Sequence, residues 1–338
     1  MTGGLAAEAR PGRPGRKHGH GGRWHRLGHR IRPHSHAVST PRNDPLTKTT
    51  EGIRAVKVSL AWLMATALAQ LVVVFLSGSA ALLADTLHNF SDALTAVPLW
   101  IAFVLARRRP TKRFTYGYGR AEDIAGLLIV VMIGLSAVIA AWQAIERLSN
   151  AQVMTHLGWV AGAGLVGCLG NELVARYRIR VGRRIGSVAL VADGYHARTD
   201  GVTSLAVTLG AFGVWLGLPL ADPIIGLLIA LAIAAVFFGA GRDVLRRIMD
   251  GVDPALVESI EAILNQETGT ENGTVRARWL GHELTAEATV VTNPNLTLGQ
   301  ASDLSDHLAA TVLNGVPELD SAIVHVKAKP AEVPNATA

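Results

Sequence analysis

Long apolar stretches follow one another through the middle of the chain. Each is about as long as the ~20 residues that a membrane-spanning helix needs. They cover residues 55–76, 80–106, 122–147, 155–175, 187–216 and 220–240. Their length and order predict six transmembrane helices, in a domain spanning residues 54–248.

The two ends of the chain are different in character. Residues 1–53 are rich in Arg, Gly, Pro and His, which predicts a disordered basic tail. They are not expected to be a cleaved signal peptide, because no apolar stretch directly follows the basic residues. After the sixth apolar stretch, the spacing of apolar positions predicts the order helix, strand, strand, helix, strand, over residues 254–266, 274–279, 283–292, 299–313 and 322–327.

The predicted fold is therefore a mainly α membrane protein, with six transmembrane helices followed by a small α+β domain. This second domain covers residues 252–329 and its element order suits a ferredoxin-like fold. Residues 330–338 are predicted to be a second disordered tail.

Composition supports a membrane protein and excludes several other classes. Hydrophobic residues make up 49% of the chain and charged residues 17%, against ~25% charged in an average soluble domain. The single cysteine, Cys168, excludes a disulfide scaffold and a zinc site built from cysteines. The net charge of +6 gathers in short runs between apolar stretches, which favours lipid over nucleic acid as a partner.

Lysine and arginine lie in every second link between the apolar stretches. They gather in residues 107–120, 176–184 and 242–247, whereas the links around Gly78, Asn150 and Gly217 have essentially none. By the positive-inside rule, both termini and the α+β domain are predicted to be cytoplasmic in a multi-pass membrane protein.

One motif occurs twice inside the apolar stretches. Residues 84–92 and 192–200 both read A-D-x-x-H-x-x-x-D. On a helix, positions four apart share a face, so His88 pairs with Asp92 and His196 with Asp200. Two imidazole nitrogens and two carboxylate oxygens form a tetrahedral set suited to Zn²⁺. The alternative, a core histidine with a helix-capping aspartate, has less weight here because ionisable groups are costly in a bilayer and usually functional.

Other polar residues lie near these pairs. Asp85 and Asp193, three positions before each histidine, are predicted to orient the imidazoles, with a proton relay or a polar plug as alternatives. Arg198 points away from the motif face towards a carboxylate or a lipid headgroup. Glu172 is predicted to form a helix cap or an interhelical hydrogen bond.

Together these residues resemble the cation diffusion facilitator family, also called the cation efflux family. The resemblance rests on the two H-x-x-x-D helices, on Tyr116–Glu122 (YGYGRAE) at the end of the basic link after the second apolar stretch, and on Asp222-Pro223 at the start of the sixth apolar stretch. It implies a homodimeric secondary transporter, not an enzyme, in a bacterial plasma membrane. Such a protein exports divalent metal from the cytoplasm in exchange for protons by alternating access.

The resemblance also assigns the ligands of the transported ion. These are the two motif pairs, and family members with two His and two Asp are usually zinc exporters that tolerate cadmium. The metal is cargo, so no resident cofactor is expected. The proton exchange also follows from the residues themselves, because ligands must lose their protons to bind metal and imidazole titrates near neutral pH.

The chain departs from the family at other sites. A metal site in the C-terminal domain is expected to be absent, since Thr289, Ser302 and Lys327 replace ligands there and only His325 remains. The link at residues 112–118 likewise lacks ligands suited to zinc. The family's His-rich loop is short and Arg-rich here, so the tail is a candidate metal collector or lipid anchor, through His18, His20, His25, His29, His34 and His36.

Other functions remain open at this point. The same ligands serve Cd²⁺, Co²⁺, Ni²⁺ and Fe²⁺. Paired aspartates within spans also fit an intramembrane hydrolase, and a membrane-bound metal sensor is a third possibility. Neither of these two accounts for a motif that occurs twice with metal-ligand spacing.

Overall fold

The structure is a computed structural model that describes residues 45–77, 80–149, 157–218, 220–267 and 270–329. The tail histidines and residues 330–338 lie outside this part of the chain.

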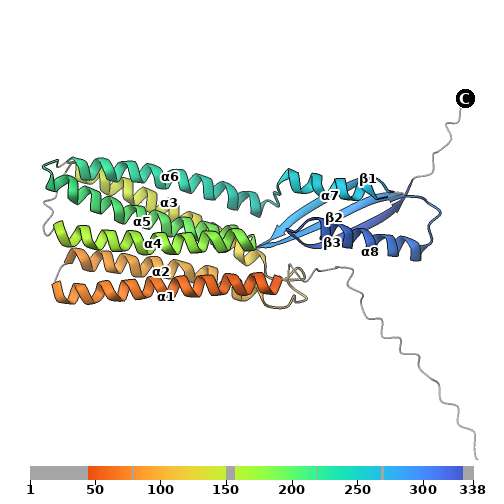
Figure 1. The fold of residues 1–338 in the computed structure, drawn as a ribbon, viewed down its shortest axis with the longest axis horizontal. Helices are drawn as coiled ribbons and strands as arrows, with labels where there is room; N and C mark the ends of the chain where they lie inside the picture. The colour runs from red at the N-terminus through yellow and green to blue at the C-terminus, as the bar shows by residue number, and fades with distance from the viewer. Residues whose placement is uncertain (1–44, 78–79, 150–156, 219, 268–269, 330–338) are drawn as a thin grey trace, which may run out of the picture. The chain divides into compact units, whose positions relative to one another are not determined.

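The first part of the described chain is a bundle of long helices that lie side by side (Figure 1). Helices α4 and α5 form a closely packed hairpin, α3 packs on α5 and α6, α1 packs on α2 and α4, and α2 contacts α3 and α5. Their bounds are α1 Pro45–Ser77, α2 Ala80–Ala106, α3 Arg120–Ser149, α4 Leu157–Ile185, α5 Val188–Trp215 and α6 Ala221–Ile248.

Three stretches among the described residues are long and apolar enough to cross a membrane: Pro45–Ala69, Arg120–Glu146 and Pro223–Ile248. Helices α4 and α5 have the length, but charged side chains such as Arg178, Asp193 and Asp200 lower their hydropathy and are buried against neighbouring helices. The count of six spans therefore stays a prediction. The six helices themselves are present as predicted.

Two of the predicted boundaries need correction. Residues 45–53, predicted to belong to a disordered tail, form the first turns of α1. Contacts with the C-terminal domain stabilise this polar segment, and apolar spacing alone could not reveal them. The arginines of residues 176–184, predicted to lie in a link, are in the last turns of α4.

The outward surface of the bundle is apolar. Large side chains such as Trp142, Leu231 and Phe238 are more than two-thirds exposed, while the interior packs Phe103 and Ile133 completely. A soluble protein rarely exposes apolar surface of this extent, whereas lipid covers it at no cost. The packing therefore fits an integral membrane protein.

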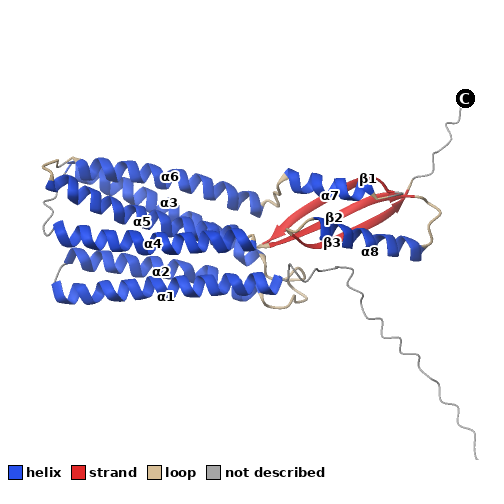
Figure 2. Cartoon of the chain, viewed as in Figure 1, coloured by secondary structure: helices blue, strands red, loops and turns tan. Residues whose placement is uncertain are grey.

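The C-terminal domain has the predicted α+β order, with α7 Pro254–Gln266, β1 Thr270–Leu280, β2 Glu283–Thr292, α8 Leu298–Gly315 and β3 Leu319–Ala328 (Figure 2). Strand β2 is central, antiparallel to β1 and parallel to β3. Leu264 of α7 and Leu308 of α8 are buried in one apolar core with Leu284 and Val290 of β2. The described elements match a ferredoxin-like βαββαβ order without its first strand.

Residue-level signals explain the domain's two helices. Asp253 caps α7 by accepting a hydrogen bond from the Ala255 amide, and Pro254 occupies the first turn, where its missing N–H costs nothing. Thr297 and Gln300 form a reciprocal capping box at the start of α8. These local signals account for the close agreement between the predicted and observed bounds.

The turn between β1 and β2 packs tightly against the start of α3. Gly281 in this turn has φ +63°, and a Cβ added there would lie 2.7 Å from the carbonyl oxygen of Gly119. A Cβ added at Gly119 would in turn lie 2.7 Å from the Leu280 carbonyl oxygen. Two glycines thus allow the backbones to approach closely at this contact.

We expect Gly281→Ala to lower thermal stability more than Gly217→Ala does. Gly217 has φ +83°, and no atom of the described residues lies within 4 Å of a Cβ there, so its variant carries only the left-handed backbone penalty of about 1–2 kcal/mol. Gly281→Ala adds overpacking of about 1–3 kcal/mol. Melting temperatures of the two purified variants measure the difference, and equal losses would contradict the close contact.

Candidate functional site

Helix α5 begins immediately after a tight turn and carries the second copy of the motif. Gly186 has φ +76° and closes α4, and Ser187 caps α5 by accepting a hydrogen bond from the Leu190 amide at 3.0 Å. This turn sets α4 and α5 antiparallel, and the motif side chains Asp193, His196 and Asp200 on α5 are buried in the bundle.

His196 and Asp200 lie on one face of α5. They are 2% and 8% exposed, and His196 Nδ1 lies 3.8 Å from Asp200 Oδ1. The hydroxyl groups of Thr199 and Ser204 donate to the carbonyl oxygens of His196 and Asp200. A buried imidazole beside a carboxylate can supply one nitrogen and one oxygen ligand to a divalent cation.

The first copy of the motif is on α2. Its residues are helical and α2 packs against α5, so the two motif helices are neighbours. The side chains of Asp85, His88 and Asp92 lie outside the described part of the structure. Within that part, no three His, Cys, Asp or Glu side chains are placed to hold one metal ion. The convergence of the two motif pairs therefore stays a prediction.

Asp193 forms an ion pair with an arginine of the preceding helix. Its Oδ2 atom lies 3.1 Å from Nη1 of Arg178 on α4, and the two side chains are 0% and 1% exposed. The described contacts thus pair Asp193 with a guanidinium, and its role in orienting the imidazole of His196 stays a prediction. Sequence reasoning missed Arg178 because it is one of five arginines in what was predicted to be a cytoplasmic link.

A second ion pair joins the same two helices. Arg198 donates two hydrogen bonds to the carboxylate of Glu172, at 3.1 and 3.2 Å, and Arg176 donates a third at 2.7 Å. Arg198 thus has a carboxylate partner and Glu172 an interhelical hydrogen bond, as predicted, and the two form a single contact. On α5, His196 lies between the residues of the two ion pairs.

His282, in the turn between β1 and β2, makes a buried polar contact between the C-terminal domain and the helices. Its Nδ1 lies 2.7 Å from Glu122 Oε2 on α3, and its Nε2 lies 3.0 Å from the Thr49 hydroxyl on α1. Thr49 donates its own hydrogen to the Pro45 carbonyl, so its oxygen is left to accept from His282. Both ring nitrogens are then donors, which is the bonding pattern of a protonated imidazole.

Charge explains this protonation. Burial lowers the pKa of His282. The charge of the adjacent Glu122 carboxylate, its hydrogen bond to the ring and the charge of Glu283 raise the pKa by more than burial lowers it, so the pKa lies above its ordinary value. The sequence signal for this contact was weak: a Gly-His turn between two strands, and an acidic residue following the Tyr-Gly-Tyr-Gly stretch.

Further contacts attach the C-terminal domain near the same turn. Arg247 of α6 donates to the carbonyl oxygens of Gly186 and Gly281 and lies over the ring of Trp279. Lys48 of α1 pairs with the buried Asp320 at 2.6 Å. The turn at His282 thus contacts or neighbours α1, α3, α6 and the α4–α5 turn.

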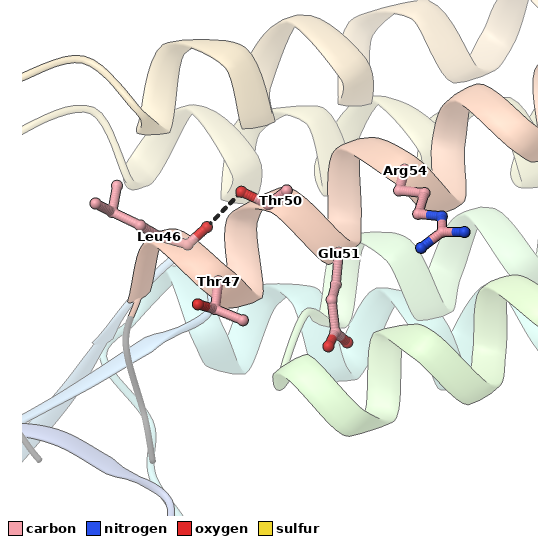
Figure 3. A pocket seen from close by; sticks show the side chains of 5 residues that line it. All are labelled: Leu46, Thr47, Thr50, Glu51 and Arg54. Carbon is pink, nitrogen blue, oxygen red and sulfur yellow. Dashed lines mark hydrogen bonds between the residues drawn. The ribbon is translucent and has the colours of Figure 1, made fainter. Parts of the chain in front are cut away.

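A surface hollow of about 360 Å³ lies at the start of α1 (Figure 3). Every lining residue comes from this one helix, and Glu51, its acidic group, lies 3.9 Å from Arg184. The hollow holds no set of metal ligands and is not a candidate site. Its lining residues are Leu46, Thr47, Thr50, Glu51 and Arg54.

Comparison with known proteins identifies the family. Residues 56–249 match the model of the cation efflux transmembrane domain. The chain belongs to the cation efflux family. A "Probable cation efflux system protein" of Mycobacterium tuberculosis (strain ATCC 25618 / H37Rv) is 56% identical over 301 residues, which cover 89% of this chain and 90% of that protein.

More distant cation efflux relatives bear names that refer to different roles. The manganese efflux system protein MneS of Bacillus subtilis (strain 168) is 24% identical over 271 residues, or 79% of this chain and 91% of that protein. The magnetosome protein MamB of Magnetospirillum gryphiswaldense is 23% identical over 264 residues, or 76% and 88%. Membership of the family makes this chain an integral membrane transporter of cations.

Proposed function

We propose that this cation efflux protein exports a divalent metal ion, foremost Zn²⁺, from the cytoplasm in exchange for protons. The observation that carries the proposal is the buried His196–Asp200 pair on α5, whose spacing recurs at His88 and Asp92 on the neighbouring helix α2. The two pairs would supply two nitrogens and two oxygens to one ion.

The ligand set favours zinc over manganese. Imidazole nitrogen suits Zn²⁺, whereas carboxylate, carbonyl and water oxygens suit Mn²⁺. The name of MneS refers to manganese, but that protein shares only 24% identity with this chain. Export of Cd²⁺, Co²⁺, Ni²⁺ or Fe²⁺ through the same ligands is the alternative within the class.

Proton exchange follows from the chemistry of these ligands. The imidazole of His196 must be neutral to bind metal, so protons and metal compete for the same atoms. The positive-inside distribution of Lys and Arg supports a cytoplasmic location for both termini and the C-terminal domain. By family resemblance the transporter works as a homodimer, in a bacterial plasma membrane.

The experiment uses purified protein in proteoliposomes loaded with a zinc-sensitive dye. We expect zinc uptake only with a pH gradient across the membrane, and its loss when a protonophore collapses the gradient. A competition series with Cd²⁺, Co²⁺, Ni²⁺, Fe²⁺ and Mn²⁺ ranks the cargo. Zinc uptake that is equally fast without a gradient would contradict exchange, and no uptake of any of these metals would contradict the function.

The choice of metal can be tested at His88. Replacing it by aspartate exchanges a nitrogen ligand for a hard oxygen, so we expect the ratio of manganese to zinc transport to rise by about tenfold. The assay is initial uptake of each metal in the same proteoliposomes, normalised to folded protein. An unchanged ratio would contradict the assignment of His88 as a ligand.

A further inference from the structure

The ion pair between Arg178 and Asp193 is completely buried but incompletely bonded. The guanidinium and carboxylate lie 3.1 Å apart, with 1% and 0% of the side chains exposed. Within the described residues, Nε and Nη2 of Arg178 and both carboxylate oxygens of Asp193 have no hydrogen-bond partner. The contact therefore holds two opposite charges together without the network that usually accompanies them.

Such an arrangement is a poor way to stabilise a fold. Removing two charges from water is costly, and their attraction offsets the cost only when hydrogen bonds satisfy the remaining atoms. The pair formed by Glu172 and Arg198 has those bonds and is partly exposed. Unsatisfied buried groups in a native protein call for an explanation, and inside a membrane that explanation is usually functional.

The position of the pair suggests what it does. Asp193 lies three residues before His196, so the two are neighbours along the face of α5. It lies on the side of His196 nearer the α4–α5 turn. Trp279 and His282 of the C-terminal domain lie close to that turn, 3.4 and 3.5 Å from where a Cβ on Gly186 would be. In the proposed orientation this is the cytoplasmic side, from which the exported ion reaches His196 and Asp200.

We propose that Arg178 is a tethered counter-cation that holds Asp193 when no metal is passing. An ion arriving from the cytoplasm displaces the guanidinium, binds transiently to the Asp193 carboxylate and moves on to His196 and Asp200. The buried carboxylate keeps a positive partner throughout. Displacement is easy because Nε and Nη2 of Arg178 make no hydrogen bonds to the described residues that would have to break. This role rests on the proposed transport function.

The test compares Arg178→Gln, Asp193→Asn and the double variant in the zinc proteoliposome assay. In Arg178→Gln, the metal ion no longer competes with the guanidinium for the Asp193 carboxylate, so KM is expected to fall about five- to tenfold. The ion also leaves the carboxylate more slowly, so kcat falls as well. Asp193→Asn removes the transient ligand and raises KM. The double variant has the KM of Asp193→Asn. Arg180→Gln, an exposed neighbour on α4, is the matched control and keeps the wild-type KM.

A purely structural ion pair gives a different result. The single variants then lower the melting temperature more than the double variant does, while KM per folded protein stays at the wild-type value; this overturns the inference. If Arg178→Gln fails to fold, the single variants Arg178→Lys and Asp193→Asn carry the test. Arg178→Lys keeps the counter-charge and is expected to have a near-wild-type KM, while Asp193→Asn is still expected to raise the KM. A wild-type protein that transports no metal overturns the proposed function as well, so the two failures are distinguishable.

Discussion

Replacing Asp200 by asparagine is expected to abolish zinc transport while leaving the protein folded. Asparagine has nearly the same size but no negative charge, so the proposed site loses an anionic ligand and its ability to replace metal with a proton. Loss of groups that merely support a ligand already costs about 10–100-fold, so we expect a fall of at least about 100-fold. Initial zinc uptake in proteoliposomes, with melting temperature as the check on folding, measures it.

The same substitution elsewhere on a spanning helix is the control. Asp243 is exposed on α6, and Asp243→Asn is expected to transport zinc at the wild-type rate. If Asp200→Asn is folded and also transports normally, His196 and Asp200 do not form the metal site. If both variants lose transport, removal of charge from the bundle and not loss of a ligand explains the result.

Apolar periodicity predicted most of the fold because burial and lipid exposure act on whole helices. A run of apolar residues is visible whether or not its exact contacts are known, and the caps at Asp253 and Thr297 are local signals. The periodicity could not show that a helix continues into polar residues beyond the end of an apolar stretch. The arginines of α4 and the first turns of α1 are polar, and long-range contacts stabilise them in place.

The partners of charged groups were the harder part to predict. The motif spacing placed His196 and Asp200 on one face of α5, because that relation is set by helix geometry alone. The partner of Asp193 depends on which α4 residue lies opposite after the turn at Gly186, and this register is not local information. The same holds for His282, whose partners Glu122 and Thr49 are 160 and 233 residues away in sequence.

His282 gives the second large expected effect, on stability as a function of pH. Its folded-state pKa is raised, after the opposing effect of burial, by Glu122 and Glu283. A group with a raised folded pKa stabilises the fold fully below its unfolded pKa of about 6.5 and loses that contribution as pH rises through the folded value. The wild-type protein should therefore lose thermal stability above about pH 6.5.

Replacing His282 by glutamine should remove this dependence. At about pH 6, where the imidazole is charged, the variant is expected to be less stable by about 1–3 kcal/mol, because a buried hydrogen-bonded charge pair with Glu122 is lost. The difference from wild type should shrink as pH rises to about 8.5. Melting temperatures of the detergent-solubilised proteins over this range measure it.

His307 supplies the control for this experiment. Its imidazole lies 3.7 Å from Glu267 but is 62% exposed, so His307→Gln is expected to change stability little at any pH. A difference between wild type and His282→Gln that grows with pH would contradict the protonated pair. With the expected result, the protonated His282 ring holds the β1–β2 turn to Thr49 on α1 and Glu122 on α3. Loss of that proton at alkaline pH then weakens the contact between the C-terminal domain and the transport helices.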